Sequence, residues 1–362
     1  MKTIKHALLA GGLLFSALAC AQQLPGAPHQ ADMRIDAVQR KAVIDGVIGE
    51  LHKSYVFPEQ AKKVDAALRQ HQKHGDYDAL TSAEKLSETV TAHLQTITND
   101  KHLHLFYSAE PIPPEERDNK PSAEQQAQQL AGMKSQNFGV ERVERLPFNI
   151  GYLSLHGFLP AKAAADTIGA AMTVLANTDT LIIDLRQNGG GDPATVAMLA
   201  SYFLDERTRL NDIYYRTGDR TEQMWSSDVV TGKHYGQKKD VYILTSKDTF
   251  SAAEDFSYAM KNIKRATIVG ETTGGGAHPG DVARLSEHFA IFVPNGRSIS
   301  PVTKTDWEAV GVVPDVATTA ADAMKTAQVA ILKKIAATEK NPGRLERLNA
   351  RMAAVNADKP VQ

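Results

Sequence analysis

Residues 184–191, which read DLRQNGGG, constrain the fold of this chain more than any other stretch. They follow residues 180–183, an apolar run that predicts a fully buried strand. Three glycines after a buried strand predict a loop whose backbone approaches another group closely. The N–H groups of such a loop can face a ligand or a developing negative charge.

Residues 241–246 repeat this plan, since an apolar strand runs into a polar turn and then into Ser251, where a helix is predicted to begin. One strand end therefore offers bare backbone and the other offers a serine at a helix N-terminus, which is a combination suited to acyl transfer. Further strands are predicted at 150–155 and 267–269. They alternate with helices near 161–176 and 194–204, and this alternation predicts an α/β domain with parallel, helix-covered strands.

The N-terminal part has a different pattern. Apolar residues recur at helical spacing over 34–98, with Pro58 and a Ser/Thr-x-x-Glu capping box at 81–84 as helix starts, which predicts an antiparallel helical bundle. Residues 102–107 then predict a strand with His102 and His104 on one face. We expect five segments: a signal peptide at 1–21, a helical domain at 22–108 ending in the histidine-bearing strand, a linker and polar helix at 109–147, an α/β core at 148–340, and a flexible tail at 341–362.

The first residues have the features of a secretory signal peptide, with Lys2 and Lys5 ahead of an apolar stretch at 7–18 and small residues after it. The apolar stretch is too short for a permanent span, so we expect a periplasmic or secreted protein that is not transmembrane. Cleavage after Ala21 removes the only cysteine, Cys20, and with it any disulfide chemistry; lipidation of Cys20 is the less favoured alternative. Loss of the two lysines takes the formal net charge from −1 to about −3, so the chain has no excess of positive charge that would favour binding to nucleic acid.

Ser251 has two interpretations. Ser251-Ala252-Ala253-Glu254 is itself a capping box, and a serine in that place is commonly no more than an N-cap. The functional interpretation uses the same geometry, because a helix N-terminus stabilises anionic oxygen and the Ala252 N–H can help to bind it.

Four motifs in order support the functional interpretation: residues 184–191, the Ser251-Ala252 pair, residues 270–275 (GETTGG) and residues 311–315 (GVVPD). Together they resemble the carboxy-terminal processing (tail-specific) serine protease family over about 150–317. The resemblance implies a crotonase-like (ClpP/crotonase-type) α/β core with Ser251 as nucleophile. It also implies an oxyanion hole made by the N–H groups of Ala252 and Gly190.

The chain departs from the main family pattern at Gly276, where bacterial and chloroplast processing proteases place a lysine base. Glycine cannot accept a proton, so a Ser-Lys dyad is excluded at that position. The chain looks closer to the branch that includes the tricorn protease core and interphotoreceptor retinoid-binding protein. That resemblance implies His102, in an Asp-x-His segment, as the base and Glu308, just before the GVVPD motif, as the third group. Chemically, histidine titrates in the useful range and a carboxylate on its other nitrogen fixes its tautomer.

Two other histidines stay open as the base: His104, on the same predicted face as His102, and His278, on the loop where the family lysine is missing. Asp184 and Arg186 are expected to be a structural pair that shapes the glycine loop. The scattered histidines do not supply a full zinc-ligand set, so no metal and no cofactor is expected.

Three functions compete. The favoured one is an exported serine peptidase acting on a peptide or protein substrate, and the alternative is an apolar-ligand-binding protein on the same scaffold. A dinucleotide enzyme is disfavoured, because the Gly189-x-Gly191-x-x-Ala194 match is loose and no acidic residue follows at the required distance. Only about 35 residues separate Glu110 from Phe148, too few for an independent domain, so we expect no PDZ domain. Whether the chain forms a homo-oligomer stays open.

Overall fold

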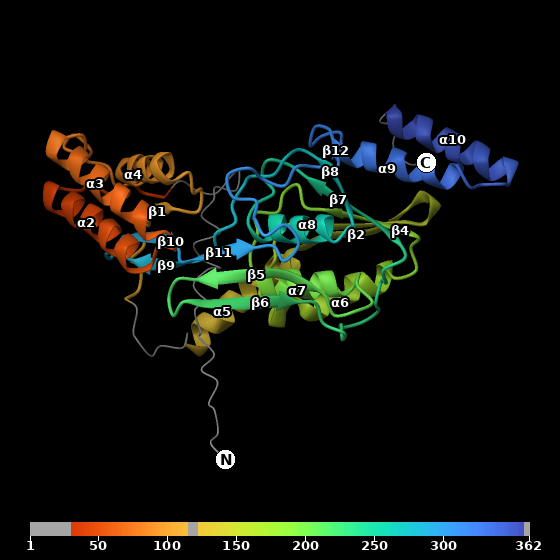
Figure 1. Ribbon diagram of the computed structural model, residues 1–362, viewed down its shortest axis with the longest axis horizontal. Helices are drawn as coiled ribbons and strands as arrows, with labels where there is room; N and C mark the ends of the chain where they lie inside the picture. The colour runs from red at the N-terminus through yellow and green to blue at the C-terminus, as the bar shows by residue number, and fades with distance from the viewer. Residues whose placement is uncertain (1–29, 115–121, 358–362) are drawn as a thin grey trace, which may run out of the picture. The chain divides into compact units, whose positions relative to one another are not determined.

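The computed structural model describes residues 30–114 and 122–357, which form two compact units (Figure 1). The first unit is the described part of Met1–Gly132 with Tyr214–Arg220 and His278–Arg297. The second unit is Met133–Ile213, Thr221–Ala277 and the described part of Ser298–Gln362. The predicted signal peptide lies outside the described residues.

The first unit packs three helices on a small antiparallel sheet. The helices are α2 (Ala37–Ser54), α3 (Pro58–His74) and α4 (Ala83–Thr98), and the sheet has the order β1-β10-β9, with β1 at His104–Tyr107, β9 at Gly280–Arg284 and β10 at Phe289–Pro294. The helix ends follow local sequence: Asp36 and Gln39 form a capping box, and Gly75 ends α3 with φ at 79°. The cap of α4 is Ser82, which accepts from the Lys85 N–H, and this shifts the predicted capping box by one residue.

One apolar core holds the first unit together. It joins buried residues of the three helices to alternate residues of β1 and β10, among them Leu105, Ile291 and Val293. The predicted histidine-bearing strand is present but shorter than expected. It begins at His104, and His102 lies in the turn before it. The sequence placed residues 278–297 in the α/β core; that boundary is corrected, since β9 and β10 pair with β1 instead.

The second unit is built on a six-stranded sheet with the order β12-β8-β7-β4-β3-β2. The strands are β2 (Val140–Leu146), β3 (Ile150–Leu155), β4 (Thr180–Asp184), β7 (Asp240–Thr245), β8 (Thr267–Gly270) and β12 (Val316–Ala317). Only β2 is antiparallel to its neighbour; the other neighbours pair in parallel. The predicted parallel α/β arrangement is therefore confirmed.

Helices cover both faces of this sheet, because alternate strand residues enter two different cores. Leu181 and Ile183 of β4 pack with α6 (Ala161–Leu175), α7 (Pro193–Ser201) and α8 (Ala252–Asn262). Ile182 faces the other way, toward α9 (Ala323–Ala336) and α10 (Pro342–Asn356). Figure 1 shows α9 and α10 together on one side of the sheet. Burial on both faces explains the continuous apolar run at 180–183.

The expected flexible tail is wrong over most of its length. Residues Pro342–Asn356 form α10, capped by Asn341, and Leu348 and Val355 are buried against the sheet-facing core. Burial of one leucine side chain contributes about 1.5–3 kcal/mol, which is enough to hold a terminal helix in place.

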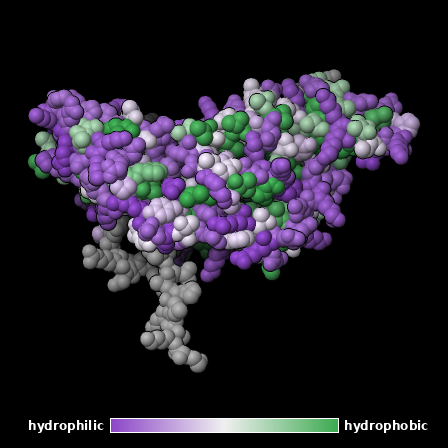
Figure 2. All heavy atoms as spheres, in the orientation of Figure 1, coloured by the Kyte–Doolittle hydropathy of each residue, from purple (hydrophilic) through white to green (hydrophobic). Residues whose placement is uncertain are grey.

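The remaining elements are peripheral. They are the polar helix α5 (Ala123–Ser135), the short 3-10 turns η2 (Asn137–Gly139) and η3 (Pro147–Asn149), and a third sheet of order β11-β5-β6 with β5 at Arg209–Tyr215, β6 at Arg220–Trp225 and β11 at Gly296–Ile299. The helix α5 matches its prediction, whereas the strands β5 and β6 were not predicted from the sequence. On the face shown in Figure 2, hydrophilic and apolar side chains are interspersed.

Candidate active site

Ser251 lies between the carboxyl end of β7 and the first residue of α8. Its backbone has φ 54° and ψ −120°, a conformation that a residue with a side chain rarely adopts. Such strain costs on the order of 1–3 kcal/mol and is concentrated at functional sites. The position is therefore more than an ordinary helix cap.

The glycine loop after β4 lies directly against Ser251. Gly190 has φ 109°, and a Cβ there would be 2.7 Å from the Ser251 Cβ and 2.9 Å from the Ala252 nitrogen. A side chain is thus excluded for both conformational and steric reasons. The Gly190 N–H, which the sequence analysis predicted as an oxyanion-hole donor, donates to Asn188 Oδ1 at 2.9 Å and so already has an acceptor.

Glu254 holds the serine and a second loop together. Its fully buried carboxylate accepts from the Ser251 N–H at 2.9 Å, the Gly275 N–H at 2.6 Å, the Gly276 N–H at 2.9 Å and the Thr273 hydroxyl at 2.5 Å. Burial raises the pKa of Glu254, although these hydrogen bonds act to lower it. The sequence indicated Glu254 only as a capping residue, because its hydrogen bonds to residues 273–276 depend on the fold.

Glu308 also contacts this loop. Its Oε2 accepts from the Ala277 N–H at 2.5 Å, and the neighbouring Trp307 donates its indole N–H to the Gly276 carbonyl at 2.7 Å. We call Ser251, Glu254, Gly190, the loop 274–277 and Glu308 the serine set; all of it lies in the second unit.

The first unit contains a cluster of largely buried side chains centred on Asp100. Asp100 Oδ2 is 2.8 Å from His278 Nδ1 and accepts from the Tyr55 hydroxyl at 3.1 Å, while Oδ1 accepts from the His102 backbone N–H at 3.1 Å. The side chain of His278 also meets the Phe57 ring edge-on, with 5.0 Å between centroids. We call Tyr55, Asp100, His102 and His278 the Asp100 cluster. The sequence named both histidines, and it named Asp100 only as the first residue of the Asp-x-His segment, with no role for its carboxylate.

The three candidate bases differ in surroundings. Burial lowers the pKa of His102 to about 4; the charge of Asp100 raises it and His278 lowers it further. His104 is exposed on β1 beside the ring of Phe106, with 4.4 Å between centroids, and is not part of the Asp100 cluster. The expectation that His102 and His104 share a strand face is therefore wrong, because His102 precedes the strand.

Asp184 and Arg186 form the structural pair that the sequence predicted. Arg186 donates from Nε to Oδ1 at 2.9 Å and from Nη2 to Oδ2 at 2.6 Å, and its Nη1 donates to the Ala320 carbonyl at 2.7 Å. Burial raises the pKa of Asp184, but the hydrogen bonds and charge of Arg186 outweigh this and the net shift is downward. This fork fixes the start of the glycine loop.

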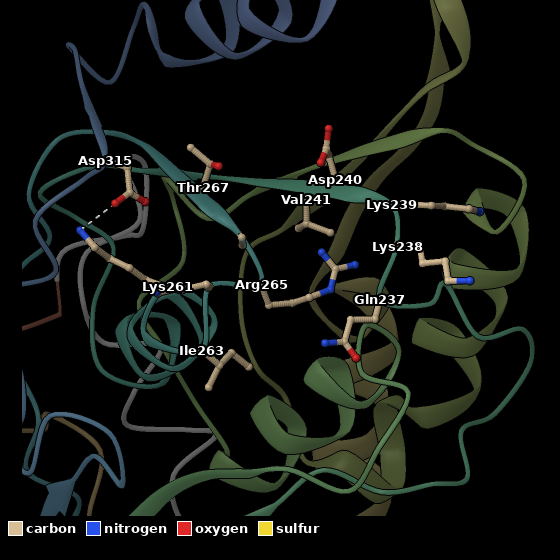
Figure 3. A pocket seen from close by; sticks show the side chains of 12 residues that line it. Gln237, Lys238, Lys239, Asp240, Val241, Lys261, Ile263, Arg265, Thr267 and Asp315 are labelled. Carbon is tan, nitrogen blue, oxygen red and sulfur yellow. Dashed lines mark ion pairs between the residues drawn. The ribbon is translucent and has the colours of Figure 1, made fainter. Parts of the chain in front are cut away.

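A pocket of about 420 Å³ in the second unit lies away from the serine (Figure 3). It is found at the amino ends of β7 and β8, where Asp240 and Thr267 begin those strands, whereas Ser251 follows the carboxyl end of β7. Two of its lining residues, Lys261 and Asp315, form an ion pair of 3.1 Å. Its remaining basic lining residues are Lys238, Lys239, Lys264 and Arg265.

Comparison with known families matches most of the chain. The sequence model of peptidase family S41 matches residues 149–318, and the model of the N-terminal domain of that family in eukaryotic IRBP matches residues 37–138. The chain belongs to peptidase family S41. The first match contains Ser251 and Glu308, and the second contains Asp100 and His102.

Several curated relatives are processing peptidases. The chain is 30% identical over 176 residues to carboxyl-terminal-processing peptidase 2, chloroplastic, of Arabidopsis thaliana, and the match covers 46% of this chain and 31% of that protein. It is 32% identical over 170 residues to the chloroplastic C-terminal processing peptidase of Tetradesmus obliquus, covering 46% and 34%. The match to a tail-specific protease of Haemophilus influenzae is 28% identical over 99 residues and covers 27% and 13%. The chain thus matches about a third or less of the length of these relatives.

Solved structures share the fold. A candidate peptidase from Parabacteroides merdae superposes with a TM-score of 0.54 at 18% identity, covering 77% of this chain and 90% of that one. A lipoprotein from Streptococcus agalactiae superposes with a TM-score of 0.53 at 12% identity, covering 86% and 99%. In residues 30–114 and 122–357, no helix is long and apolar enough to cross a membrane.

Proposed function

We propose that this protein is a serine peptidase that hydrolyses peptide bonds with Ser251 as the nucleophile. The observation that carries the proposal is the strained Ser251 backbone, held by Glu254 at the N-terminus of α8 and packed against Gly190. Membership of peptidase family S41 and the processing peptidases among its relatives support the same reaction.

In the proposed reaction the Ser251 Oγ attacks the scissile carbonyl while a histidine of the Asp100 cluster takes the hydroxyl proton. The same imidazolium then gives that proton to the leaving amine. Water afterwards cleaves the acyl-enzyme by the reverse sequence, with the imidazole again acting as base.

The negative charge on the carbonyl oxygen needs donors near Ser251. The Ala252 N–H is the stronger candidate, since it belongs to the first turn of α8, where the helix dipole also favours an anion. Gly190 is the second candidate from the sequence, and it can contribute only if its N–H is shared with or released by Asn188. Glu308 is proposed to support the loop 274–277 through Ala277 and to add negative charge near the imidazolium.

The wider architecture is proposed to be a crotonase-like core with a helical N-terminal region and no PDZ domain. The parallel sheet covered on both faces supports this arrangement, as do the described residues between Glu110 and Phe148, which form α5, η2 and β2. Export to the periplasm or the medium is proposed from the signal-like residues 1–21. A peptide or protein is the proposed substrate.

An apolar-ligand-binding protein on the same scaffold is the weaker alternative. A pure binding protein has no use for a serine in a strained backbone beside a glycine loop, because strain of this kind lowers stability without adding apolar contact area. The relatives named above are peptidases, which also disfavours it.

A fluorophosphonate probe tests the proposal on the full chain. The wild type should label covalently and hydrolyse a peptide library, and Ser251→Ala should lose both. Ser227→Ala removes an exposed hydroxyl outside the serine set and should behave as the wild type. Hydrolysis that persists in Ser251→Ala would contradict the proposed nucleophile.

A further inference from the structure

We infer that the pocket at the amino ends of β7 and β8 binds a small anion that carries phosphate groups, and that Arg265 and nearby lysines recognise it. The pocket has a volume of about 420 Å³, and all of its lining residues belong to the second unit. Pockets of this size hold small-molecule ligands. The inference goes beyond the proposed peptidase reaction, because no lining residue belongs to the serine set or to the Asp100 cluster.

The first argument is the charge of the pocket lining. Five basic residues against two acidic ones leave an excess of three positive charges. Both acidic residues already have partners, since Asp315 pairs with Lys261 at 3.1 Å and Asp240 pairs with Lys334 of α9 at 2.6 Å. In Figure 3 the Asp240 carboxylate points away from the Arg265 guanidinium. The lining acids therefore do not neutralise the other cations.

The second argument concerns the lysines of the lining that remain. In the part of the chain that the structure describes, Lys238, Lys239 and Lys264 form no ion pair. Lys239 lies over the Tyr235 ring, with its Nζ 4.5 Å from the centroid, and Lys238 and Lys264 are exposed. Exposed lysine side chains turn toward a ligand without breaking a structural contact. The rim of the pocket thus offers ammonium groups that have no competing carboxylate.

The third argument is the arrangement of Arg265, which is only 8% exposed. Its Nε donates to the Phe203 carbonyl and its Nη2 to the Gly236 carbonyl, both at 2.7 Å, and its guanidinium lies over the Phe203 ring. These contacts fix the plane of the group and leave Nη1 with no acceptor in residues 30–114 and 122–357. Burial lowers the pKa of Arg265, because nearby charges offset only part of the desolvation. A buried cation without a carboxylate is costly, and a bound anion removes that cost.

Helix capping does not explain this arrangement. The helix α8 ends at Asn262, just before the pocket, and cations favour a helix C-terminus. Lys261 fits that role, since it lies in the last turn of α8 and donates to the Val313 carbonyl. The guanidinium of Arg265 instead donates to carbonyls outside α8. A role other than capping is therefore needed for Arg265.

The donors of the pocket favour phosphate over a single carboxylate. A guanidinium is a planar fork that matches phosphate oxygens, and lysine ammonium groups add point charges around it. An excess of three positive charges attracts an anion with several negative charges more strongly than one with a single charge. Pyrophosphate is therefore a suitable probe.

Calorimetric titration of the full chain with pyrophosphate tests the inference. Lys238→Gln and Lys264→Gln should each raise the Kd by about 5-fold, the effect of one unit charge about 4 Å away in water. Arg265→Lys keeps the charge but loses the fork, so it should raise the Kd on the order of 10-fold. Lys162→Gln removes an exposed lysine of α6 outside the pocket lining and should bind as the wild type does.

Thermal unfolding of each variant identifies any loss of binding that comes from misfolding. The two exposed-lysine variants keep the test valid if Arg265→Lys does not fold. Anionic phosphatidylglycerol vesicles added to the complex distinguish the source of the phosphate, since displacement of pyrophosphate indicates a lipid headgroup and retention indicates a free compound. Either result supports the site if Lys238→Gln weakens the binding.

The contrary outcomes are also defined. A Kd for pyrophosphate weaker than about 1 mM in the wild type would overturn the inference. Equal weakening in Lys162→Gln and in the pocket variants would overturn it too, because binding would then depend on overall charge alone. Ser251→Ala should bind pyrophosphate as the wild type does, so failure of the peptidase proposal leaves this inference intact.

Discussion

The serine set and the Asp100 cluster each contain a buried carboxylate that accepts several hydrogen bonds, but they differ in how far apart in the sequence the bonded residues are. In the serine set, backbone N–H groups converge on Glu254 from residues 3, 21 and 22 positions away, and Glu308 is 31 positions from Ala277. In the Asp100 cluster, side chains meet across long separations, 178 positions for His278 and 45 for Tyr55. A set made from nearby loops can be inferred from motifs, whereas a cluster of distant side chains requires the fold.

The largest effect expected concerns the one carboxylate on which the serine set depends. Glu254→Ala leaves three backbone N–H groups and the Thr273 hydroxyl without their buried acceptor, so it should lower the free energy of unfolding by about 3–5 kcal/mol. Urea denaturation measures this. Glu88→Ala, which removes an exposed partner of Lys85, is the matched control and should stay within about 0.5 kcal/mol. Equal losses in both would mean that the serine set is not organised by Glu254.

A second prediction concerns Asp255, the buried neighbour of Glu254. Burial raises its pKa to about 7, although a hydrogen bond from Asn211 lowers it. The native state thus keeps the Asp255 proton, whereas the unfolded chain releases it near pH 4. The stability that the protonated carboxyl contributes is therefore present at low pH and is lost as pH rises toward about 7.

Asp255→Asn should remove that pH dependence, a change on the order of 2–4 kcal/mol between pH 4 and pH 8. Urea denaturation across this range measures it, with Asp228→Asn at an exposed carboxyl as the control. Identical pH profiles for the wild type and Asp255→Asn would show that Asp255 is ionised in the native state.

The Asp100 cluster should respond to acid in the opposite direction. The pKa of His102 is lowered from 6.5 to about 4, so the stability from its neutral ring is complete above pH 6.5 and is lost as pH falls toward 4. His102→Gln should therefore show a weaker loss of stability over this range, by about 1–2 kcal/mol. Thermal unfolding at several pH values checks this, and an unchanged acid sensitivity would place the titrating group elsewhere.

The smallest effect is expected at His104, the candidate that the structure leaves outside the Asp100 cluster. Its ring is exposed and contacts Phe106, so His104→Ala should change stability by no more than about 0.5 kcal/mol and kcat/KM by less than twofold. Peptide hydrolysis with parallel thermal unfolding measures both. A large decrease in kcat/KM in a stably folded His104→Ala variant would show that His104 takes part in the reaction although it lies outside the Asp100 cluster.

The sequence was sufficient where function depends on local backbone. The apolar run 180–183, the glycines after it and Ser251 before a helix predicted β4, the close approach of Gly190 and the start of α8. The Asp184–Arg186 pair was predictable too, because Asp184 ends β4 and Arg186 follows it by only two positions.

The sequence was insufficient to predict contacts between residues that are far apart in the chain and are brought together by strand pairing. Pairing of β9 and β10 with β1 moves residues 278–297 out of the expected core, and no periodicity along one strand indicates its partner. The same pairing brings His278 to Asp100, so the sequence could name both residues without joining them. The helix α10 was missed because its buried positions, Leu348 and Val355, are sparse among polar residues.

A crystal structure of the full chain after treatment with a phosphonate is the most direct test that Ser251 is the nucleophile at the start of α8. The account predicts the phosphorus bonded to the Ser251 Oγ, with a phosphonyl oxygen within about 3.2 Å of the Ala252 nitrogen. An adduct on another residue, or a folded protein that forms no adduct, would contradict it.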